Sequence, residues 1–218
     1  PAAYQKEQDP IRGVFAYVAD GLLQPGEEAP AHQPQLLPGQ VKLKNINGDD
    51  KLNEEDMVLI GRNDPKFIFG FNNNFSYKNF DLNIYMYGQV GKIAGANSYY
   101  DAWGSYGNRI KLGQNVPVSF KDAWSSDNQT STRPSFIESA YGTGDLFLQK
   151  ISFLRIRNIT LGYTVPISKS ICNRLRVYAD VNNPCVWTNW KGQDPETDSN
   201  TNAYPNVTSF SIGVDISF

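Results

Sequence analysis

The last ten residues of the chain read Ser209-Phe-Ser-Ile-Gly-Val-Asp-Ile-Ser-Phe218. Apolar and polar residues alternate here without exception, which is the period-two pattern of a β-strand with one face out of water. The pattern alone also fits a half-buried strand of a soluble β-sandwich. An aromatic residue beside the terminal carboxylate is an unusual end for such a domain, so the stretch favours the closing strand of a transmembrane barrel. The residues predicted to form its closing and assembly signal are Phe210, Ile212, Val214, Ile216 and Phe218.

A hairpin is predicted over residues 66–88. Aromatic residues occupy one face of its first half, at Phe67, Phe69, Phe71, Phe75 and Tyr77. With Lys78-Asn79 as a two-residue loop, Tyr77 pairs with Phe80, Phe75 with Leu82 and Phe71 with Met86. Both strands then place their apolar residues on the same face, and this agreement supports the register.

A second hairpin is predicted over residues 146–187. The apolar positions change parity near Asn158, which indicates a β-bulge. The returning strand places Arg176 and Asp180 on its second face, opposite the apolar positions. A watery lumen tolerates charges there better than a packed sandwich core does.

The links between these strands alternate in length. Short links at residues 78–79 and 167–173 alternate with long ones at 89–145 and 188–206. Outer-membrane barrels have short periplasmic turns and long extracellular loops, so residues 20–65 and 89–145 are predicted to be extracellular and 207–218 to be the closing strand. With residues 13–18 as a further strand, the count is six. Because barrels need at least about eight, the remainder is expected from sequence outside this chain.

The composition excludes several function classes. A formal net charge of -2 gives no electrostatic footprint for nucleic acid. No apolar run reaches the roughly 18 residues of a membrane-spanning helix. His32 is the one histidine, which argues against histidine-based catalytic triads and zinc clusters. Cys172 and Cys185 are expected to be free thiols, because an extended strand between them would hold them too far apart for a disulfide.

The chain resembles the C-terminal part of SusC/RagA-type TonB-dependent transporters. The matching stretches, in chain order, are Val41-Lys-Leu-Lys-Asn-Ile-Asn-Gly-Asp-Asp-Lys-Leu-Asn53, Ile60-Gly61 with Pro65 and Phe69-Gly-Phe71, Phe75-Ser-Tyr-Lys-Asn-Phe-Asp-Leu82, Phe153-Leu-Arg-Ile-Arg-Asn-Ile-Thr-Leu-Gly-Tyr-Thr-Val-Pro166, Gly192-Gln-Asp-Pro-Glu196, Tyr204-Pro205 and 210–218. They cover nearly the whole chain.

The resemblance implies an all-β fold, namely the C-terminal strands of an antiparallel transmembrane barrel of about 22 strands with a plugged lumen and long extracellular loops. It implies import of glycan oligomers or peptides across the outer membrane of a Gram-negative bacterium. A SusD-like surface lipoprotein, TonB, the lipid bilayer and the rest of the barrel with its plug would be the partners. The plug and the TonB-contacting segment belong to the family's N-terminal part, which is not in this sequence. No enzymatic activity and no firmly held cofactor are expected.

Residues 45–56 resemble a calcium-binding loop. Its oxygen ligands would come from Asn45, Asn47, Asp49, the carbonyl of Lys51, Asn53 and Asp56. Position 1 lacks the usual carboxylate, position 6 is Asp50 rather than glycine, and position 12 is not glutamate. Weakly bound calcium is therefore one interpretation, and a polar turn held by Asn and Asp side chains is the other.

Aromatic residues gather in the longest loop, at Tyr99, Tyr100, Trp103, Tyr106 and Trp124. They could contact a sugar substrate or the lid lipoprotein, or they could pack the loop against itself. Trp187 and Trp190 follow the rising strand and are predicted to lie in an interfacial aromatic girdle.

Two loop carboxylates, Asp194 and Glu196, leave a hydrolase formally open. Acidic loop residues are usually solvated, and solvation is the prediction here. The competing overall interpretation is a soluble β-sandwich module that binds carbohydrate or calcium.

Overall fold

The computed structural model describes residues 11–95, 112–113, 115, 118–136, 140–167, 172–192, 194–197 and 204–218. Within these ranges the chain is all-β, with strands and two short 3-10 helices and no α-helix. No helix among them is long and apolar enough to cross a membrane. The chain divides into two compact units, of which the second comprises residues 65–92, 150–197 and 202–218.

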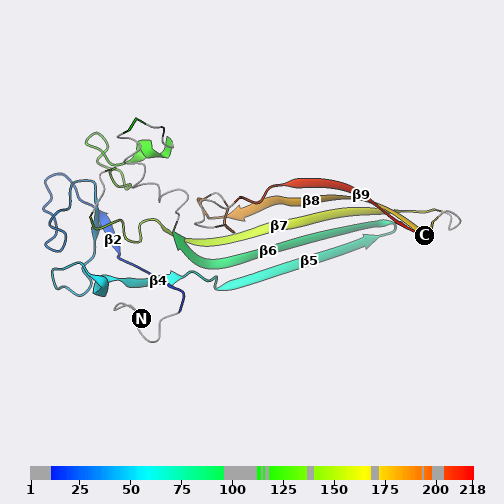
Figure 1. Ribbon diagram of the computed structural model, residues 1–218, viewed down its shortest axis with the longest axis horizontal. Coiled ribbons are helices and arrows are strands. Elements are labelled where there is room, and N and C mark those ends of the chain that lie inside the picture. Colours follow the sequence, from blue (N-terminus) through cyan, green and yellow to red (C-terminus); the bar gives the residue numbers. More distant parts are fainter. Residues whose placement is uncertain are drawn as a thin grey trace. The chain divides into compact units, whose positions relative to one another are not determined.

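The second unit is built on an antiparallel sheet of five strands in the order β5-β6-β7-β8-β9 (Figure 1). The strands are β5 (Phe67–Tyr77), β6 (Phe80–Gly95), β7 (Leu148–Val165), β8 (Arg174–Thr188) and β9 (Ser209–Ser217). Sequence neighbours are also neighbours in the sheet, so the chain runs up and down. The 78–79 turn, the 166–173 link and the C-terminus therefore share one end, here the turn end. The opposite end is the loop end.

The register of the sheet agrees with the sequence pattern. Tyr77 pairs with Phe80, Phe75 with Leu82 and Phe71 with Met86, which confirms the predicted hairpin. Lys78 has a φ of 53°, a left-handed conformation that costs a non-glycine residue roughly 1–2 kcal/mol. The carbonyl of Asn79 accepts a hydrogen bond of 2.8 Å from the backbone N–H of Thr164, which ties this turn to β7.

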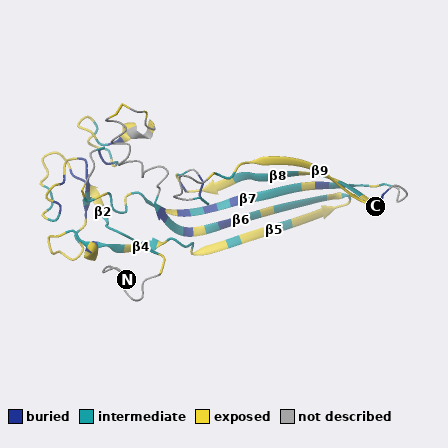
Figure 2. Cartoon of the chain, in the orientation of Figure 1, coloured by how far each residue is buried: buried dark blue, intermediate teal, exposed yellow. Residues whose placement is uncertain are grey.

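Pairing of β8 with β9 continues the separation of the two faces. Val177 lies opposite Val214 and Ala179 opposite Ile212, whereas Arg176 lies opposite Asp215 and Asp180 opposite Ser211. The apolar residues remain open to the surroundings: Phe210 is 77% exposed and Ile212 is 83% exposed. Figure 2 shows the same for the two outer strands, β5 and β9, which carry most of the exposed positions of the sheet. The sheet therefore has one continuous apolar face that no described segment covers.

The first unit contains shorter strands. They are β1 (Gly13–Ala16), β2 (Ala19–Leu22), β3 (Val41–Leu43) and β4 (Val58–Arg62), and β1 pairs with β4 while β2 pairs with β3. The 3-10 helices are η1 (Glu54–Asp56) and η2 (Val118–Asp122). Its small core is formed by Leu22, Val41 and Leu43. Gln33 is fully buried beside it, where its amide accepts the N–H of Leu43 and donates to the carbonyl of Val41.

Two expectations from the sequence need correction. Residues 13–18 do not add a sixth strand to the long sheet, because β1 is only four residues long and its hydrogen bonds go to β4. The hairpin strands also run past their predicted limits: β6 continues to Gly95 and β8 to Thr188. Backbone pairing extends wherever a partner strand is available, and alternation of side chains alone does not reveal where that ends.

The open apolar face generates a first prediction. In buffer without detergent, the isolated chain should self-associate, because aromatic side chains and two unpaired sheet edges are exposed together among the described residues. Size-exclusion chromatography with light scattering measures this directly. A monomer that melts cooperatively in plain buffer would contradict a barrel-wall role for the sheet.

Candidate functional site

The polar face of the sheet carries an organised set of side chains. Alternate positions place asparagine, aspartate, arginine, threonine and tyrosine on it. At the β5–β6 pair, the amide of Asn83 donates to Asn72 at 2.8 Å and to Asn74 at 2.6 Å. These uncharged groups both donate and accept hydrogen bonds, and Asn72 and Asn74 are exposed while Asn83 is half-buried, so they can bind sugar hydroxyls or peptide amides.

An arginine joins three strands of this face near the turn end. Nη2 of Arg176 on β8 lies 2.6 Å from Oδ2 of Asp81 on β6, and Nη1 lies 3.1 Å from Oδ2 of Asp215 on β9. The guanidinium reaches Asp81 by crossing β7 above Gly162. A Cβ atom at Gly162 would collide with both Arg176 and Asp81. Glycine at this position therefore leaves room for the guanidinium to donate hydrogen bonds to both carboxylate oxygens of Asp81.

A second polar cluster surrounds Asp180 farther along β8. Its Oδ1 accepts a hydrogen bond of 2.7 Å from Thr160 and another from the amide of Asn158. Its Oδ2 accepts one of 2.7 Å from Asn182. The carboxylate accepts these hydrogen bonds from three uncharged side chains, and they stabilise its charge without a basic residue.

A β-bulge lies in β8 opposite Arg157, the residue of β7 that faces both Asn183 and Pro184. The register of β7 against β8 shifts between Ile156 and Asn158, which confirms the bulge that the parity change predicted. Arg155 and Arg157 are two positions apart on β7 and lie on the same side of the strand, and both arginines contact Glu196. Arg157 also lies over the ring of Tyr87, 5.8 Å from its centroid.

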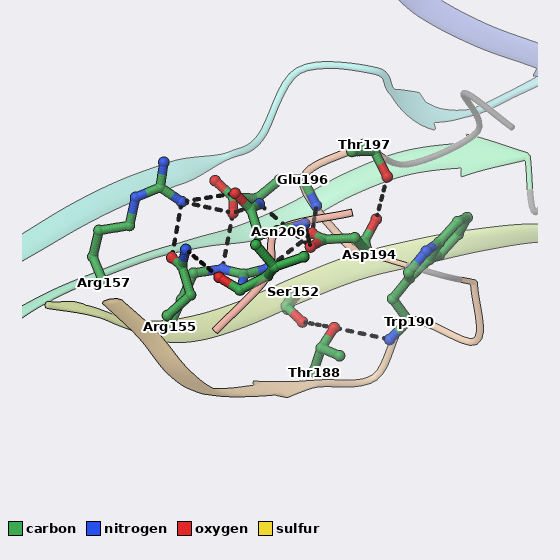
Figure 3. Close-up of polar contacts among 11 residues, drawn as sticks. Ser152, Arg155, Arg157, Thr188, Trp190, Asp194, Glu196, Thr197 and Asn206 are labelled. Atoms are coloured by element: carbon green, nitrogen blue, oxygen red, sulfur yellow. Dashed lines mark hydrogen bonds and ion pairs between the residues drawn. The ribbon is translucent and has the colours of Figure 1, made fainter. Parts of the chain in front are cut away.

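The segment after β8 folds back onto these arginines (Figure 3). Nη2 of Arg155 donates to Oδ1 of Asp194 at 2.8 Å, and both side chains are almost fully buried, at 3% and 5% exposure. Nε of Arg155 lies 2.8 Å from Glu196, off the N–H direction, so that contact is an ion pair without a hydrogen bond.

Asp194 also closes the base of the β8–β9 loop. It accepts the backbone N–H of Glu196 at 2.9 Å and that of Asn206 at 3.1 Å, which joins the two legs of the loop. Burial by itself would raise the pKa of Asp194, but these backbone N–H groups and the charge of Arg155 outweigh it and lower the pKa. Burial raises the pKa of Glu196, whose carboxylate accepts from the amide of Asn206 at 2.6 Å.

This cluster corrects the expectation that Asp194 and Glu196 are solvated. Asp194 is 4% exposed and committed to Arg155, and Glu196 is committed to both arginines and to Asn206. Neither carboxylate is placed as an unoccupied acid or base for hydrolysis. A signal for this pairing was present in the sequence: two arginines at alternate positions of a strand and two carboxylates spaced in the same way in the following loop. Only the return of the loop after β8 onto β7 brings these groups together.

The two tryptophans at the end of β8, Trp187 within the strand and Trp190 just after it, differ in exposure. Trp187 is 55% exposed at the loop end, as expected for an aromatic girdle. Trp190 is only 6% exposed, so its predicted place in that girdle is wrong. Its ring lies against Gly192, where a Cβ atom would collide with the indole, and this packing removes it from the surface.

The aromatic residues of the longest loop are described only in part. Tyr99, Tyr100, Trp103 and Tyr106 lie outside the described residues. Trp124 packs its ring over Gly39 and beside the core of the first unit. For Trp124 the structure therefore favours packing within the loop region over contact with a substrate.

The proposed calcium ligands are engaged in local hydrogen bonds. Asp56 is fully buried and accepts the N–H of Ile46 at 2.7 Å and that of Asn53 at 3.0 Å. Asn45, Asn47, Asp49 and Asn53 each accept a backbone N–H two or three residues ahead. Asp50 adopts a φ of 57°, the conformation for which glycine is preferred at that position. In this conformation the oxygens stabilise a polar turn.

The predicted closing strand is found as β9. Its apolar residues lie on the exposed face of the sheet: Phe210, Ile212, Val214 and Ile216, followed by Phe218 after the strand. The strand pairs with β8 on one side, and no described strand pairs with its other side.

Comparison with known proteins agrees with this architecture. No family model matches the chain. TonB-dependent receptor P3 of Formosa agariphila is 27% identical over 236 residues, a match that covers 98% of this chain and 23% of that receptor. TonB-dependent receptor SusC of Bacteroides thetaiotaomicron is 27% identical over 180 residues, which covers 79% of this chain and 17% of SusC.

Solved structures share the fold. The RagAB peptide importer in its open-open state matches with a TM-score of 0.72 and 23% identity over 94% of this chain and 22% of that chain. A second structure, of the RagAB peptide transporter, matches with a TM-score of 0.71 at 22% identity. The chain is SusC/RagA-like: it is similar to one segment of these TonB-dependent receptors. It spans about a quarter or less of the length of the relatives that it matches.

The buried ion pair of this SusC/RagA-like segment generates a second prediction. In the full-length receptor, Asp194→Ala should destabilise the loop end of the sheet by about 3–5 kcal/mol, because the buried Arg155 loses its hydrogen-bonded carboxylate and the backbone N–H groups of Glu196 and Asn206 lose their acceptor. The temperature at which the folded, heat-modifiable band disappears on a gel measures the effect.

Asp215→Ala is the matched control for this prediction. Asp215 also pairs with an arginine of the same sheet, but its side chain is 58% exposed, so its loss should cost no more than about 1 kcal/mol. Equal shifts for both variants would show that Asp194 is not a buried anchor.

A third prediction concerns residues 45–56 of this segment. Calcium should bind at about the millimolar level or more weakly, because few carboxylates are offered and Asp56 is already hydrogen-bonded. Isothermal titration calorimetry with calcium tests this. A micromolar affinity that is abolished by Asp49→Ala would show instead that the loop is a metal site.

Proposed function

We propose that this chain forms part of the barrel wall of an outer-membrane nutrient importer in a Gram-negative bacterium. The observation that carries the proposal is the division of one five-stranded sheet into an exposed apolar face and a hydrogen-bonded polar face. Lipid would contact the face of Phe75, Ile212 and Val214. The lumen would contact the face of Asn83, Arg176 and Asp180. In a bilayer only closed barrels satisfy every strand edge, so the two outer strands would pair with the remainder of the barrel.

The alternative of a soluble β-sandwich receives no support from the sheet. A sandwich buries the inner face of each sheet against another sheet about 10 Å away. Here the apolar face is exposed along its length, with Phe71 at 54%, Phe75 at 58% and Ile216 at 53%. The polar face carries ion pairs that a packed core would have to desolvate.

The orientation of the wall follows from the lengths of its links. We place the turn end at the periplasm and the loop end outside the cell, since barrels of this kind keep their long links extracellular. Residues 20–65 and 89–145 would then belong to the extracellular side. Phe218, 87% exposed beyond β9, would lie at the periplasmic rim.

Glycan oligomers or peptides are the proposed substrates, and a SusD-like surface lipoprotein is the proposed lid. The names of the relatives support this choice, since one is SusC and another is the RagAB peptide importer. The exposed amides of Asn72 and Asn74, bonded to the half-buried Asn83, suit either substrate, because amides bond sugar hydroxyls and peptide groups alike. Energy would come from TonB through parts of the receptor outside this chain. No catalytic step is assigned to any residue.

A fourth prediction tests which face meets the lipid. In the full-length receptor, Ile212→Lys should cut the yield of folded, heat-modifiable barrel in the outer membrane, because a lysine facing lipid near the midplane costs roughly 2–4 kcal/mol. Ser211→Lys, one residue away on the polar face, should leave the yield near normal.

Both variants introduce a lysine, at adjacent positions of β9 and therefore at nearly the same depth. They differ in the face of the sheet that receives the lysine. Equal loss of folded barrel from both would indicate a strand packed on two faces, as in a sandwich. A larger loss from Ser211→Lys would reverse the assignment of lumen and lipid.

A further inference from the structure

Part of the Arg157 guanidinium has no partner among the described residues. Its Nη1 atom is the donor in all three of its hydrogen bonds, to Asn183, Glu196 and Asn206, and each of them is 3.3 Å long. Nε and Nη2 donate to no described residue. Figure 3 shows Arg157 at the border of the cluster, with one terminal nitrogen turned toward Glu196 and the other turned away from it. On β8, Arg176 uses Nε and Nη2 to hold both carboxylate oxygens of Asp81, so the corresponding pair on Arg157 can hold the carboxylate of a ligand.

Arg157 lies on the polar face of the sheet. Its guanidinium carbon is 5.8 Å from the centroid of the Tyr87 ring. Tyr87 follows Met86 on β6, and Met86 pairs with Phe71 of the apolar face. Because side chains of a strand alternate between its two faces, Tyr87 points to the polar side, and Arg157 with it. The proposed lumen that contacts Asn83 would therefore also reach Arg157.

The charge of Arg157 is less well compensated than that of Arg155. Arg155 lies 2.8 Å from a carboxylate oxygen of Asp194 and 2.8 Å from one of Glu196, and its side chain is buried. Arg157 contacts Glu196 alone, at 3.3 Å, and its side chain is 41% exposed. A negatively charged ligand can therefore approach Arg157 while the buried pair of Arg155 and Asp194 stays intact.

Groups suited to a sugar ring lie beside Arg157 on the same face. Tyr85 is two positions from Tyr87 on β6, so it shares that face, and it is 40% exposed. Its ring leans toward Gly70, where a Cβ atom would lie 3.7 Å from the phenolic oxygen. Asn72 is the partner of Tyr85 in the ladder. The amide oxygen of Asn72 accepts a hydrogen bond of 2.8 Å from β6, whereas its amide nitrogen donates to no described residue.

We propose that Arg157, Tyr85 and Asn72 bind a uronic-acid residue of an oligosaccharide, with its carboxylate on Nε and Nη2 of Arg157. The inference rests on the proposed importer function, which makes this face the wall of the lumen, and it narrows the proposed substrates to acidic glycans. The exposed ring of Tyr85 packs against the C–H face of the sugar, and the amide nitrogen of Asn72 donates to a hydroxyl. A peptide offers a carboxylate at its C-terminus but no rigid ring with hydroxyl groups, so the oligosaccharide fits the whole set of groups better.

The test measures binding of tetragalacturonate and of tetraglucuronate to the full-length receptor by isothermal titration calorimetry, each beside its fully methyl-esterified form. The ester keeps the rings and hydroxyls and removes the charge. At least one acid should bind more tightly than its ester. Arg157→Gln should lower the affinity for that acid by about 10- to 100-fold and leave the affinity for the ester unchanged. Arg157→Lys keeps the charge without the planar pair of donors, so it should recover only part of the loss.

A second variant separates a binding role of Arg157 from a structural one. Glu196→Gln removes the one carboxylate that Arg157 contacts, so it should raise the affinity for the acid by about two- to fivefold. An arginine that served only to hold the loop would give no such gain. Its substitution would instead lower the temperature at which the heat-modifiable band disappears, and it would weaken acid and ester alike.

Arg174→Gln is the matched control. Arg174 lies two positions from Arg176 on β8, hence on the same polar face, and it is exposed at the turn end of the sheet. Its substitution should leave the affinities for acid and ester unchanged. Equal weakening of acid binding by Arg174→Gln and Arg157→Gln would show that the net charge of the lumen attracts the acid, and it would overturn the site.

Two further results would overturn the proposal. In the first, neither acid binds more tightly than its ester. In the second, tetra-alanine with a free C-terminal carboxylate is preferred over its amide through Arg157 while the uronates are not, which assigns the site to peptide termini. Either result, obtained with a receptor that runs as a folded, heat-modifiable barrel, removes the uronate site alone. A receptor that gives no heat-modifiable form removes the barrel-wall function as well.

Discussion

The antiparallel backbone hydrogen-bond ladder of β5 to β9 is the constraint on which the rest of this segment depends. Because side chains alternate with a period of two, a fixed register decides for all five strands at once which residues share a face. Pairing Phe75 with Leu82 and Ala179 with Ile212 collects the apolar residues on one side. A slip by one residue in any strand would place charges such as Arg176 among them.

The bulge of β8 opposite Arg157 is the one register shift in the β7–β8 ladder, and the most buried charges of the sheet lie beside it. Arg155 and Arg157 lie on the same side of β7, where the returning loop supplies two carboxylates. Burying Arg155 would be costly if it were unpaired, so the loop is fixed where its carboxylates are needed. The ion pairs between the two arginines of β7 and the loop carboxylates thus determine the position of the β8–β9 loop base.

Glycines have a comparable role on both faces of the sheet. Gly162 leaves room for Arg176 to reach across a strand to Asp81, and Gly88 leaves room for the ring of Phe69. Neither position has a positive φ, so their value lies in the absent side chain and not in backbone freedom. Both allow a neighbouring side chain to lie over the strand, which shapes the polar network on one face and the packing of Phe69 on the other.

The sequence by itself determined the antiparallel strands, the register of the first hairpin, the bulge near Asn158 and the character of each face, because all of these follow from local alternation and turn residues. It did not determine that residues 13–16 pair with β4, that Trp190 is buried or that Asp194 anchors a loop. These depend on contacts between residues far apart in the chain, such as Arg155 and Asp194, which are 39 positions apart. A carboxylate in a loop looks the same in sequence whether water or a buried arginine faces it, and only the tertiary structure decides between the two.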